Sequence, residues 1–302
     1  MAIEHLVISG GSNTGFLFFG VLKHLFAESF LNIEDIKSIY CTSVGTLVAL
    51  FFTLKYDLHE VETFLLERPW EDLYKVDFNT IVRAIQEGGM FGRDTFAQTI
   101  KPLLLGKDLS LEITLEDFFQ YNMVDIHFFT TEYGSLELID ISHTTHPTWT
   151  LIDAIHASCA LPILIDPSFT NGKYYVDGAV LKNYPLDECL ENVKDTSTIL
   201  GLYHNTNKQV KELRVSKPFL DSNTNNRLFE YLYSFCLKLW TIVKHSKKDA
   251  ELQVPNQIGV LCDTSFGNII ESFQSKFERQ RLLSKGVEEA SIFLHYHRSN
   301  PE

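Results

Sequence analysis

The segment Cys41-Thr42-Ser43-Val44-Gly45 carries the serine best placed for nucleophilic chemistry. It has the pattern of a nucleophile elbow, G-x-S-x-G, with cysteine in place of the first glycine. An elbow presents its serine hydroxyl on a sharp turn between a strand and a helix, and small flanking residues let these two elements approach closely. A serine at such a turn can instead serve only as a helix N-cap, so this segment alone leaves both interpretations open.

A second turn, Ser9-Gly10-Gly11-Ser12-Asn13-Thr14-Gly15, is rich in glycine. The backbone N–H groups of such a loop can bind a phosphate or a developing oxyanion at the start of a helix. The spacing does not match the G-x-G-x-x-G of dinucleotide-binding folds, and the Gly-Lys-Ser/Thr ending of a phosphate-binding P-loop is missing. The sequence therefore predicts either an anion site or a purely structural tight turn here.

A third turn, Val176-Asp177-Gly178-Ala179, places a carboxylate at the end of a β-rich run. Aspartate before glycine is common in ordinary turns. A serine nucleophile, however, needs a base within hydrogen-bond reach. If the order of the strands brings this turn to the same crevice as Ser43, Asp177 can act as that base.

Two strand-helix units at the start of the chain must position the first two turns. Residues Leu6–Ser9 and Ile36–Cys41 are predicted strands, and Phe16–Phe26 and Val44–Leu54 are the helices that follow them. Consecutive units with short turns predict parallel neighbouring strands, whose connecting loops meet at the same edge of the sheet. We therefore expect the glycine loop and Ser43 to face one crevice.

The rest of the chain supplies further elements but no other clear chemistry. Residues 57–120 are predicted to be mostly helical, with a break at Glu87-Gly88-Gly89 and a helix cap at Thr114. The other predicted elements are strands at Val124–Thr131, Leu136–Ile141 and Ile199–Tyr203, helices at Thr150–Ala160, Leu228–Val243 and 276–294, a turn at Asn171-Gly172 and a polar loop at Lys208–Asn226. The apolar helix at Leu228–Val243 suits a core position, a cover over an acyl pocket or a membrane contact. No linker divides the chain, so we expect one domain over residues 1–302.

The composition is that of a globular protein. Of its 302 residues, 45% are hydrophobic and 22% are charged, and the formal net charge is −13. This charge disfavours binding along nucleic-acid backbones and strongly anionic bilayers. The cysteines, at positions 41, 159, 189, 236 and 262, form no C-x-x-C pair, so neither a disulfide framework nor a zinc site is indicated.

The start of the sequence lacks the basic residues and apolar core of a secretory signal. No apolar run is long enough to span a bilayer. We therefore expect a cytoplasmic protein that is soluble or peripheral at membranes.

Together, the three turns resemble those of the patatin-like phospholipases, whose catalytic serine and aspartate form a dyad. The resemblance runs in order from about residue 5 to residue 205. It also covers Gly20-Val21-Leu22-Lys23, the mid-chain turn at Gly89–Asp94, the helix-to-proline segment Ala154–Pro162, and Asn183-Tyr184-Pro185. The ordered set is far more specific than any one of its motifs.

This resemblance implies a three-layer α/β/α fold with a mostly parallel central sheet. It also implies a serine esterase that cleaves fatty-acyl esters of phospholipids or glycerolipids, with no metal and no cofactor. The net charge already argues against a nucleic-acid partner. In that scheme Ser43 attacks the ester carbonyl and Asp177 takes the proton. Four backbone N–H groups would hold the oxyanion, those of Gly10, Gly11, Ser12 and Val44. The residues that would support the turns are Cys41, Gly45, Gly15 and Gly178.

Three positions depart from the family pattern. Cys41 and Ser12 stand where the family usually has glycine, and Thr14 stands where it has lysine or arginine. Because the dyad residues are present, an active enzyme is favoured. The alternative is a catalytically inactive lipid-binding or interaction protein with the same fold.

A serine, acid and histidine triad is a further alternative. Four histidines follow Asp177 in the required order, at positions 204, 245, 295 and 297. The α/β-hydrolase fold, however, places its elbow after several strands, whereas Ser43 follows only the second predicted strand. His156 is predicted to be a packed helix residue without a catalytic role.

Overall fold

A computed structural model describes residues 2–205, 232 and 254–299. Its strands are β1 His5–Ile8, β2 Ser38–Thr42, β3 Gly89–Phe91, β4 Asp125–Glu132, β5 Glu137–Ile141, β6 Ile163–Ile165, β7 Ser168–Thr170, β8 Lys173–Asp177, β9 Ile199–His204 and β10 Asn256–Val260. The main sheet has eight strands in the order β10-β9-β1-β2-β4-β8-β7, with β5 paired to β4, while β3 and β6 form a separate two-stranded sheet. The five strands from β10 to β4 are parallel, and β5, β8 and β7 extend the sheet in antiparallel fashion.

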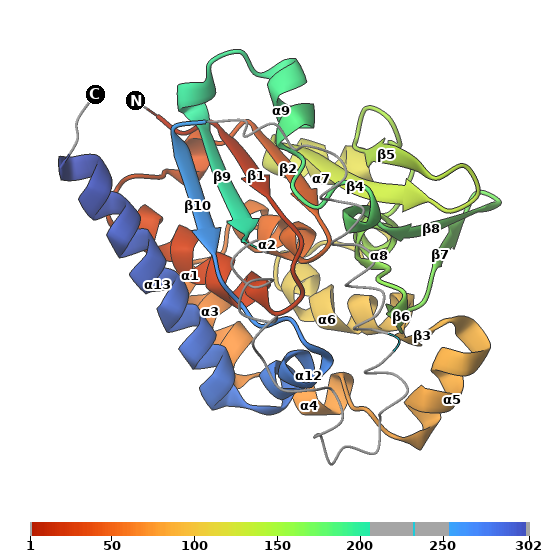
Figure 1. Cartoon of the computed structure of the whole chain (residues 1–302). Coiled ribbons are helices and arrows are strands. Elements are labelled where there is room, and N and C mark those ends of the chain that lie inside the picture. Colours follow the sequence, from red (N-terminus) through yellow and green to blue (C-terminus); the bar gives the residue numbers. More distant parts are fainter. Residues whose placement is uncertain (1, 206–231, 233–253, 300–302) are drawn as a thin grey trace.

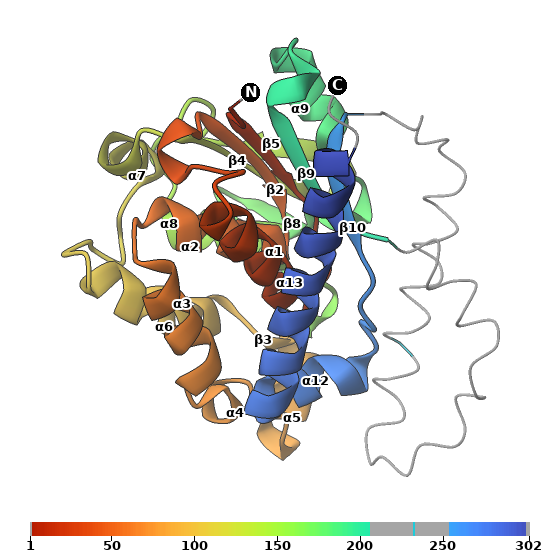
Figure 2. The ribbon, with the colours of Figure 1, turned by 90° about the vertical axis from the view of Figure 1, so that its left-hand side faces the viewer.

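Helices flank this sheet (Figures 1 and 2). They are α1 Thr14–Ala27, α2 Val44–Thr53, α3 Leu58–Glu67, α4 Trp70–Leu73, α5 Phe78–Glu87, α6 Arg93–Leu105, α7 Leu115–Asn122, α8 Leu151–Cys159, α9 Leu186–Asn192, α12 Phe266–Gln274 and α13 Lys276–Ser299. Alternate residues of β1 show that both faces are covered, because Leu6 and Ile8 join the larger apolar cluster while Val7 joins a smaller one with Leu186 of α9. The expected α/β fold with a mostly parallel central sheet is confirmed.

Helices α1 and α13 lie side by side in both views, although they stand at opposite ends of the sequence (Figures 1 and 2). Glycines make this close contact possible. A Cβ atom at Gly20 of α1 would lie 2.2 Å from the carbonyl oxygen of Leu283, and one at Gly286 of α13 would lie 2.1 Å from that of Leu17. The first and last helices therefore form one layer over the sheet.

The first two strand-helix units lie as predicted. Strands β1 and β2 are parallel neighbours, with His5 opposite Ser38 and Ile8 opposite Cys41. The loops that follow these strands therefore lie side by side at the carboxyl edge of the sheet. The predicted cap is present too, because the Thr114 hydroxyl oxygen accepts the backbone N–H of Asp117.

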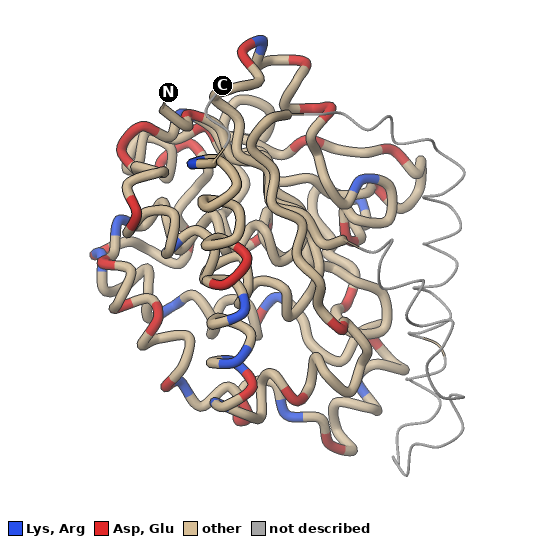
Figure 3. Tube along the Cα trace, turned by 60° about the vertical axis from the view of Figure 1, so that its left-hand side comes forward, with Lys and Arg blue, Asp and Glu red and all other residues tan. Residues whose placement is uncertain are grey.

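Other parts of the topology were not foreseen. Strands β10 and β6 and helix α12 carry no clear sequence signal, and β8 reaches the sheet as an antiparallel partner of β4. The predicted polar loop at 208–226 lies outside the described residues, and so, apart from Leu232, does the predicted helix at 228–243. On the side seen in Figure 3, basic and acidic residues are interspersed along the described trace.

Candidate active site

Ser43 occupies the turn between β2 and α2 in a strained backbone conformation. Its φ is 53° and its ψ is −129°, a region that non-glycine residues rarely adopt. Its side chain makes no capping hydrogen bond to α2, although it stands at the N-cap position. The N-cap interpretation of this serine is therefore wrong, and the hydroxyl is left for another partner.

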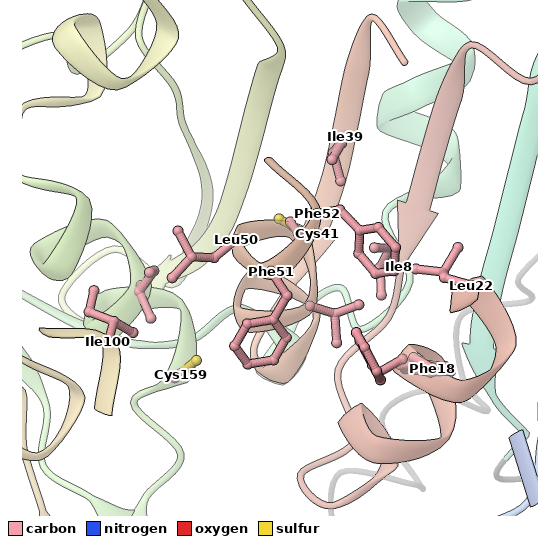
Figure 4. Close-up of a cluster of buried hydrophobic side chains, with 14 of the residues drawn as sticks. Ile8, Phe18, Leu22, Ile39, Cys41, Leu50, Phe51, Phe52, Ile100 and Cys159 are labelled. Atoms are coloured by element: carbon pink, nitrogen blue, oxygen red, sulfur yellow. The ribbon is translucent and has the colours of Figure 1, made fainter. Parts of the chain in front are cut away.

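Gly45 and Cys41, the small residues on either side of Ser43, fit their positions for different physical reasons. A Cβ atom at Gly45 would lie 2.6 Å from the carbonyl oxygen of Ile8, so only glycine lets α2 start this close to β1. Cys41 is fully buried among apolar side chains (Figure 4), and its thiol donates to the carbonyl oxygen of His127 at 3.3 Å. Burial raises the pKa of this thiol well above its ordinary value. Cys41 has no positive φ, so the strand accepts cysteine in place of glycine.

Asp177 ends β8 and meets Ser43 across the sheet. Thr130 of β4 stands opposite Asp177, and the preceding residue, Phe129, stands opposite Thr42 of β2. The Ser43 hydroxyl lies close enough to the Asp177 carboxylate to lower its pKa, and Oδ1 of this carboxylate accepts the N–H of Ala179 at 2.8 Å. Two turns more than 130 residues apart in the sequence are thus joined by the order of the strands.

The environment of Asp177 sets its acidity. The residue is 1% exposed, and burial raises its pKa from 3.8 to about 7 against the opposing effects of the nearby Ser43 hydroxyl and the Ala179 N–H. A carboxyl group with a pKa near 7 holds a proton more firmly than an ordinary aspartate and still ionises at neutral pH. These are the properties that general base catalysis requires.

The glycine loop passes directly beside Ser43. A Cβ atom at Gly10 would lie 2.9 Å from the Cβ of Ser43 and 2.6 Å from Oδ1 of Asn183. The N–H of Gly10 donates to the carbonyl oxygen of Asn183 at 3.0 Å. This bond removes the Gly10 N–H from the expected set of oxyanion donors, because the donor is already engaged.

The other expected donors differ from Gly10. Within the described ranges, the N–H groups of Gly11, Ser12 and Val44 donate no hydrogen bond to protein. Gly11 has a φ of 152° and Ser12 a φ of 50°, so the loop turns sharply at these two residues. Thr14 closes the loop, since its N–H and its hydroxyl both donate to the Gly11 carbonyl oxygen, at 2.9 and 2.8 Å.

The two remaining glycines hold these turns together. A Cβ atom at Gly15 would lie 2.6 Å from Cγ2 of Val44, so the starts of α1 and α2 are in contact. A Cβ atom at Gly178 would lie 2.2 Å from the carbonyl oxygen of Phe129. Gly15 therefore allows the first two turns to approach each other closely, and Gly178 allows the third turn to approach β4.

No described histidine completes a triad with Ser43 and Asp177. Besides burial, the influences on the pKa of Asp177 come from Ser43 and Ala179 alone. His204 Nε2 lies 3.1 Å from the carbonyl oxygen of Cys262, His295 and His297 belong to α13, and position 245 lies outside the described residues. His156 is buried on α8, where its Nε2 lies 2.8 Å from Oδ1 of Asp166, as expected for a packed helix residue.

Helix α8 also supplies neighbours of Ser43 to which the sequence assigned no role. The N–H of Ser43 donates to Oγ of Ser158 at 3.0 Å. Burial raises the pKa of the Cys159 thiol far above the ordinary value, and the nearby Ser43 hydroxyl opposes this rise. These residues lie more than 110 positions from Ser43, so no local spacing rule links them to it.

Among the helices of the described residues, none is long and apolar enough to cross a membrane.

The comparison with protein families shows what class of protein this fold and these turns define. The family model for patatin-like phospholipases matches residues 6–190, a segment that includes all three turns. The chain therefore belongs to the patatin-like phospholipase family. The predicted resemblance is confirmed.

The chain is also similar to individual proteins. Uncharacterized protein R571 of Acanthamoeba polyphaga mimivirus is 24% identical over 237 residues, which cover 78% of this chain and 76% of that protein. Probable lipid hydrolase 463L of Invertebrate iridescent virus 6 is 22% identical over 184 residues, 60% of this chain and 61% of that protein. The crystal structure of VipD from Legionella pneumophila matches 98% of this chain and 67% of its own with a TM-score of 0.58 at 14% identity, which shows a shared fold.

Proposed function

We propose that this protein is a lipid acyl hydrolase that cleaves fatty-acyl esters of phospholipids or glycerolipids through Ser43 and Asp177. The observation that carries the proposal is the position of the Ser43 hydroxyl beside a buried carboxylate, close enough to influence the pKa of that group, which is about 7. Membership of the patatin-like phospholipase family and the likeness to a probable lipid hydrolase support the choice of a lipid ester as substrate. In this proposal residues 1–302 act as one domain, with contact to a membrane surface only while substrate is taken up.

The first step forms an acyl-enzyme. The Ser43 oxygen attacks the ester carbonyl carbon while its proton passes to the Asp177 carboxylate. The tetrahedral intermediate then collapses, the bond to the alcohol breaks, and the leaving alkoxide takes the proton from Asp177. The alcohol is the lysolipid or the partially deacylated glycerolipid, and the fatty acyl group stays on Ser43.

The second step regenerates the serine. Water gives a proton to Asp177 and attacks the acyl carbonyl carbon, and a second tetrahedral intermediate forms. Its collapse releases the fatty acid, and Asp177 returns the proton to the Ser43 oxygen. One ester bond and one water molecule are consumed in each cycle, so Asp177 serves as base and then as acid in both halves of the reaction.

Backbone N–H groups hold the negative charge on the carbonyl oxygen. We assign this role to Gly11, Ser12 and Val44, which donate to no other described group, and we leave out Gly10, whose N–H is engaged by Asn183. Val44 also begins α2, where the positive end of the helix dipole adds to the stabilisation. Loss of one such donor costs about 10² to 10³ in rate in comparable enzymes.

The test is fatty-acid release from mixed phospholipid vesicles, with fluorophosphonate labelling of the same samples. Wild type, Ser43→Ala and Asp177→Asn are compared with Ser272→Ala, a control that removes a buried serine hydroxyl on α12. We expect wild type and the control to label and to release fatty acid, and both dyad variants to lose turnover. A folded wild type that neither labels nor hydrolyses would favour an inactive lipid-binding protein, the alternative that the departures at Ser12, Thr14 and Cys41 leave open.

A further inference from the structure

A single buried hydroxyl links the backbone of Ser43 to the centre of the sheet. The N–H of Ser43 donates to Oγ of Ser158 at 3.0 Å, and the Ser158 hydroxyl donates to the carbonyl oxygen of Phe129 on β4 at 2.6 Å. Ser158 is 0% exposed, so no water competes for these bonds. The hydroxyl has one proton, and Phe129 accepts it, so towards Ser43 the Ser158 oxygen can only be an acceptor.

The next residue of α8 supports the other side of Ser43. The carbonyl oxygen of Ser43 accepts the N–H of Thr46 at 2.9 Å and the Thr46 hydroxyl at 2.7 Å. Because the Thr46 proton is used there, its contact of 3.5 Å with Cys159 must have the thiol as donor. Ser158 thus bonds the peptide group before Ser43 directly, and Cys159 contacts the Thr46 hydroxyl that bonds the peptide group after it.

These bonds fix directions as well as distances. A peptide group is planar and trans, so its N–H and C=O point in opposite directions. The bond to Ser158 therefore sets the plane of the Thr42–Ser43 peptide, and the bonds from Thr46 set the plane of the Ser43–Val44 peptide, which carries the Val44 N–H. A strained conformation such as that of Ser43 persists only where the surroundings hold it in place.

We propose that Ser158 is a positioning residue for the Ser43 nucleophile. This inference rests on the proposed function, and it assigns to Ser158 the task of holding the turn that carries both the Ser43 hydroxyl and the Val44 N–H. Without the Ser158 hydroxyl, the Ser43 N–H lacks an acceptor and the turn relaxes from its strained conformation. Displacements of about 1 Å at a reacting group can cost about 10²-fold in rate.

Ser158→Ala and the matched control Ser272→Ala test this inference. Ser272 is also 0% exposed, and its hydroxyl also donates to a backbone carbonyl at 2.6 Å, but it lies on α12, which packs on α4 and α13. The substrate is a soluble short-chain p-nitrophenyl ester, and the endpoint of fluorophosphonate labelling counts competent sites. We expect Ser158→Ala to label to the wild-type endpoint, with labelling rate and kcat per site reduced about 10- to 100-fold and KM within about twofold. Ser272→Ala should keep the wild-type kcat per site.

A purely structural role gives a different pattern. If Ser158→Ala only destabilises the fold, fewer sites label while kcat per labelled site stays at the wild-type value, and the inference is overturned. The conservative variant Ser158→Thr keeps the hydroxyl and should recover part of the lost kcat if it folds. A wild type that neither labels nor hydrolyses would overturn the proposed function together with this inference. An active wild type with an unaffected Ser158→Ala would overturn the inference alone.

Discussion

The two ends of β4 each lie beside a buried ionisable side chain, Asp177 at one end and His127 at the other, and the charges around these two groups differ. At the carboxyl end, near Thr130, lies Asp177, whose carboxylate accepts the N–H of Ala179 and lies near the Ser43 hydroxyl. At the amino end lies His127, whose Nδ1 is 2.8 Å from Oδ2 of Asp140 and whose Nε2 is 3.3 Å from Oδ2 of Asp125. Among the described residues, no opposite charge lies beside Asp177, whereas two lie beside His127.

The pKa shifts follow from this difference. Burial lowers the pKa of His127, but the two carboxylates outweigh burial and raise it to about 9. At Asp177 burial dominates and raises the pKa to about 7. His127 is therefore a fixed cation at neutral pH, stacked on Tyr40 with ring centroids 4.3 Å apart, whereas Asp177 exchanges its proton in this range. A compensated buried charge stabilises the sheet, and an uncompensated one is available for proton transfer.

The largest effect that would test this contrast is on turnover. Asp177→Asn keeps the shape of the side chain but cannot take the Ser43 proton, so we expect kcat to fall by about 10² to 10⁴. The measurement is fatty-acid release at pH 8. His127→Gln, which changes the group at the other end of β4, should keep kcat within about threefold of wild type. Equal losses in the two variants would contradict the contrast.

The same Asp177→Asn substitution should raise stability at alkaline pH. A carboxyl with a folded pKa of about 7, against 3.8, contributes stability that is complete below pH 3.8 and is lost as the pH rises through 7. Asparagine does not ionise, so the variant does not lose this stability at high pH. We expect its free energy of unfolding to exceed that of wild type by on the order of 2 to 4 kcal/mol at pH 8 and by little near pH 4. Urea unfolding at the two pH values measures it. A destabilised variant at pH 8 would show that Asp177 is compensated after all.

His127→Gln should show the opposite sign. With a folded pKa of about 9 against 6.5, the histidine contributes stability that is complete below pH 6.5 and is lost as the pH rises through 9. We expect the variant to lose on the order of 3 kcal/mol at pH 6, and much less at pH 10. Urea unfolding of both proteins at each pH gives the difference. A loss that does not depend on pH would mean that packing against Tyr40, rather than charge, is what His127 supplies.

The pH profile of the wild type gives a smaller effect. Because only ionised Asp177 can accept a proton, kcat/KM on a soluble ester should fall about tenfold per pH unit below an inflection near 7. Fluorophosphonate labelling should follow the same profile. An inflection near 4 would place Asp177 in a far more polar environment than its burial indicates.

The smallest expected effect concerns Cys41 of β2, which lies between Asp177 and His127. Cys41→Gly introduces the glycine typical of the family but leaves a small cavity and removes the bond to the His127 carbonyl, so we expect a loss of about 1 to 2 kcal/mol. Activity should stay within about threefold of wild type, because Cys41 does not have a positive φ and glycine would therefore relieve no backbone strain. Thermal unfolding and ester hydrolysis measure the two quantities. A large gain in activity would show that cysteine strains the turn.

Local patterns were sufficient for the elements that carry the site. Each early strand ends in a turn rich in small residues and is followed by an apolar helix, so β1, α1, β2 and α2 could be predicted, with their parallel order. Strand β10 could not, because it has only five residues and includes Asn256 and Gly259, residue types that are depleted in strands, so only pairing with β9 makes this segment a strand. The sequence also could not predict that β8 pairs with β4 in the antiparallel direction, since a long connection between two strands allows either direction.

The sequence by itself determined the family, the three turns and the identity of Ser43 and Asp177 as candidates, because these depend on residue types at short spacing. Only the tertiary structure decided that the Gly10 N–H is engaged by Asn183, that Asp177 has a pKa near 7, and that Ser158 supports the turn. Hydrogen-bond partners and burial come from residues far apart in the chain. Proton affinity and donor availability therefore belong to the fold and not to any one segment.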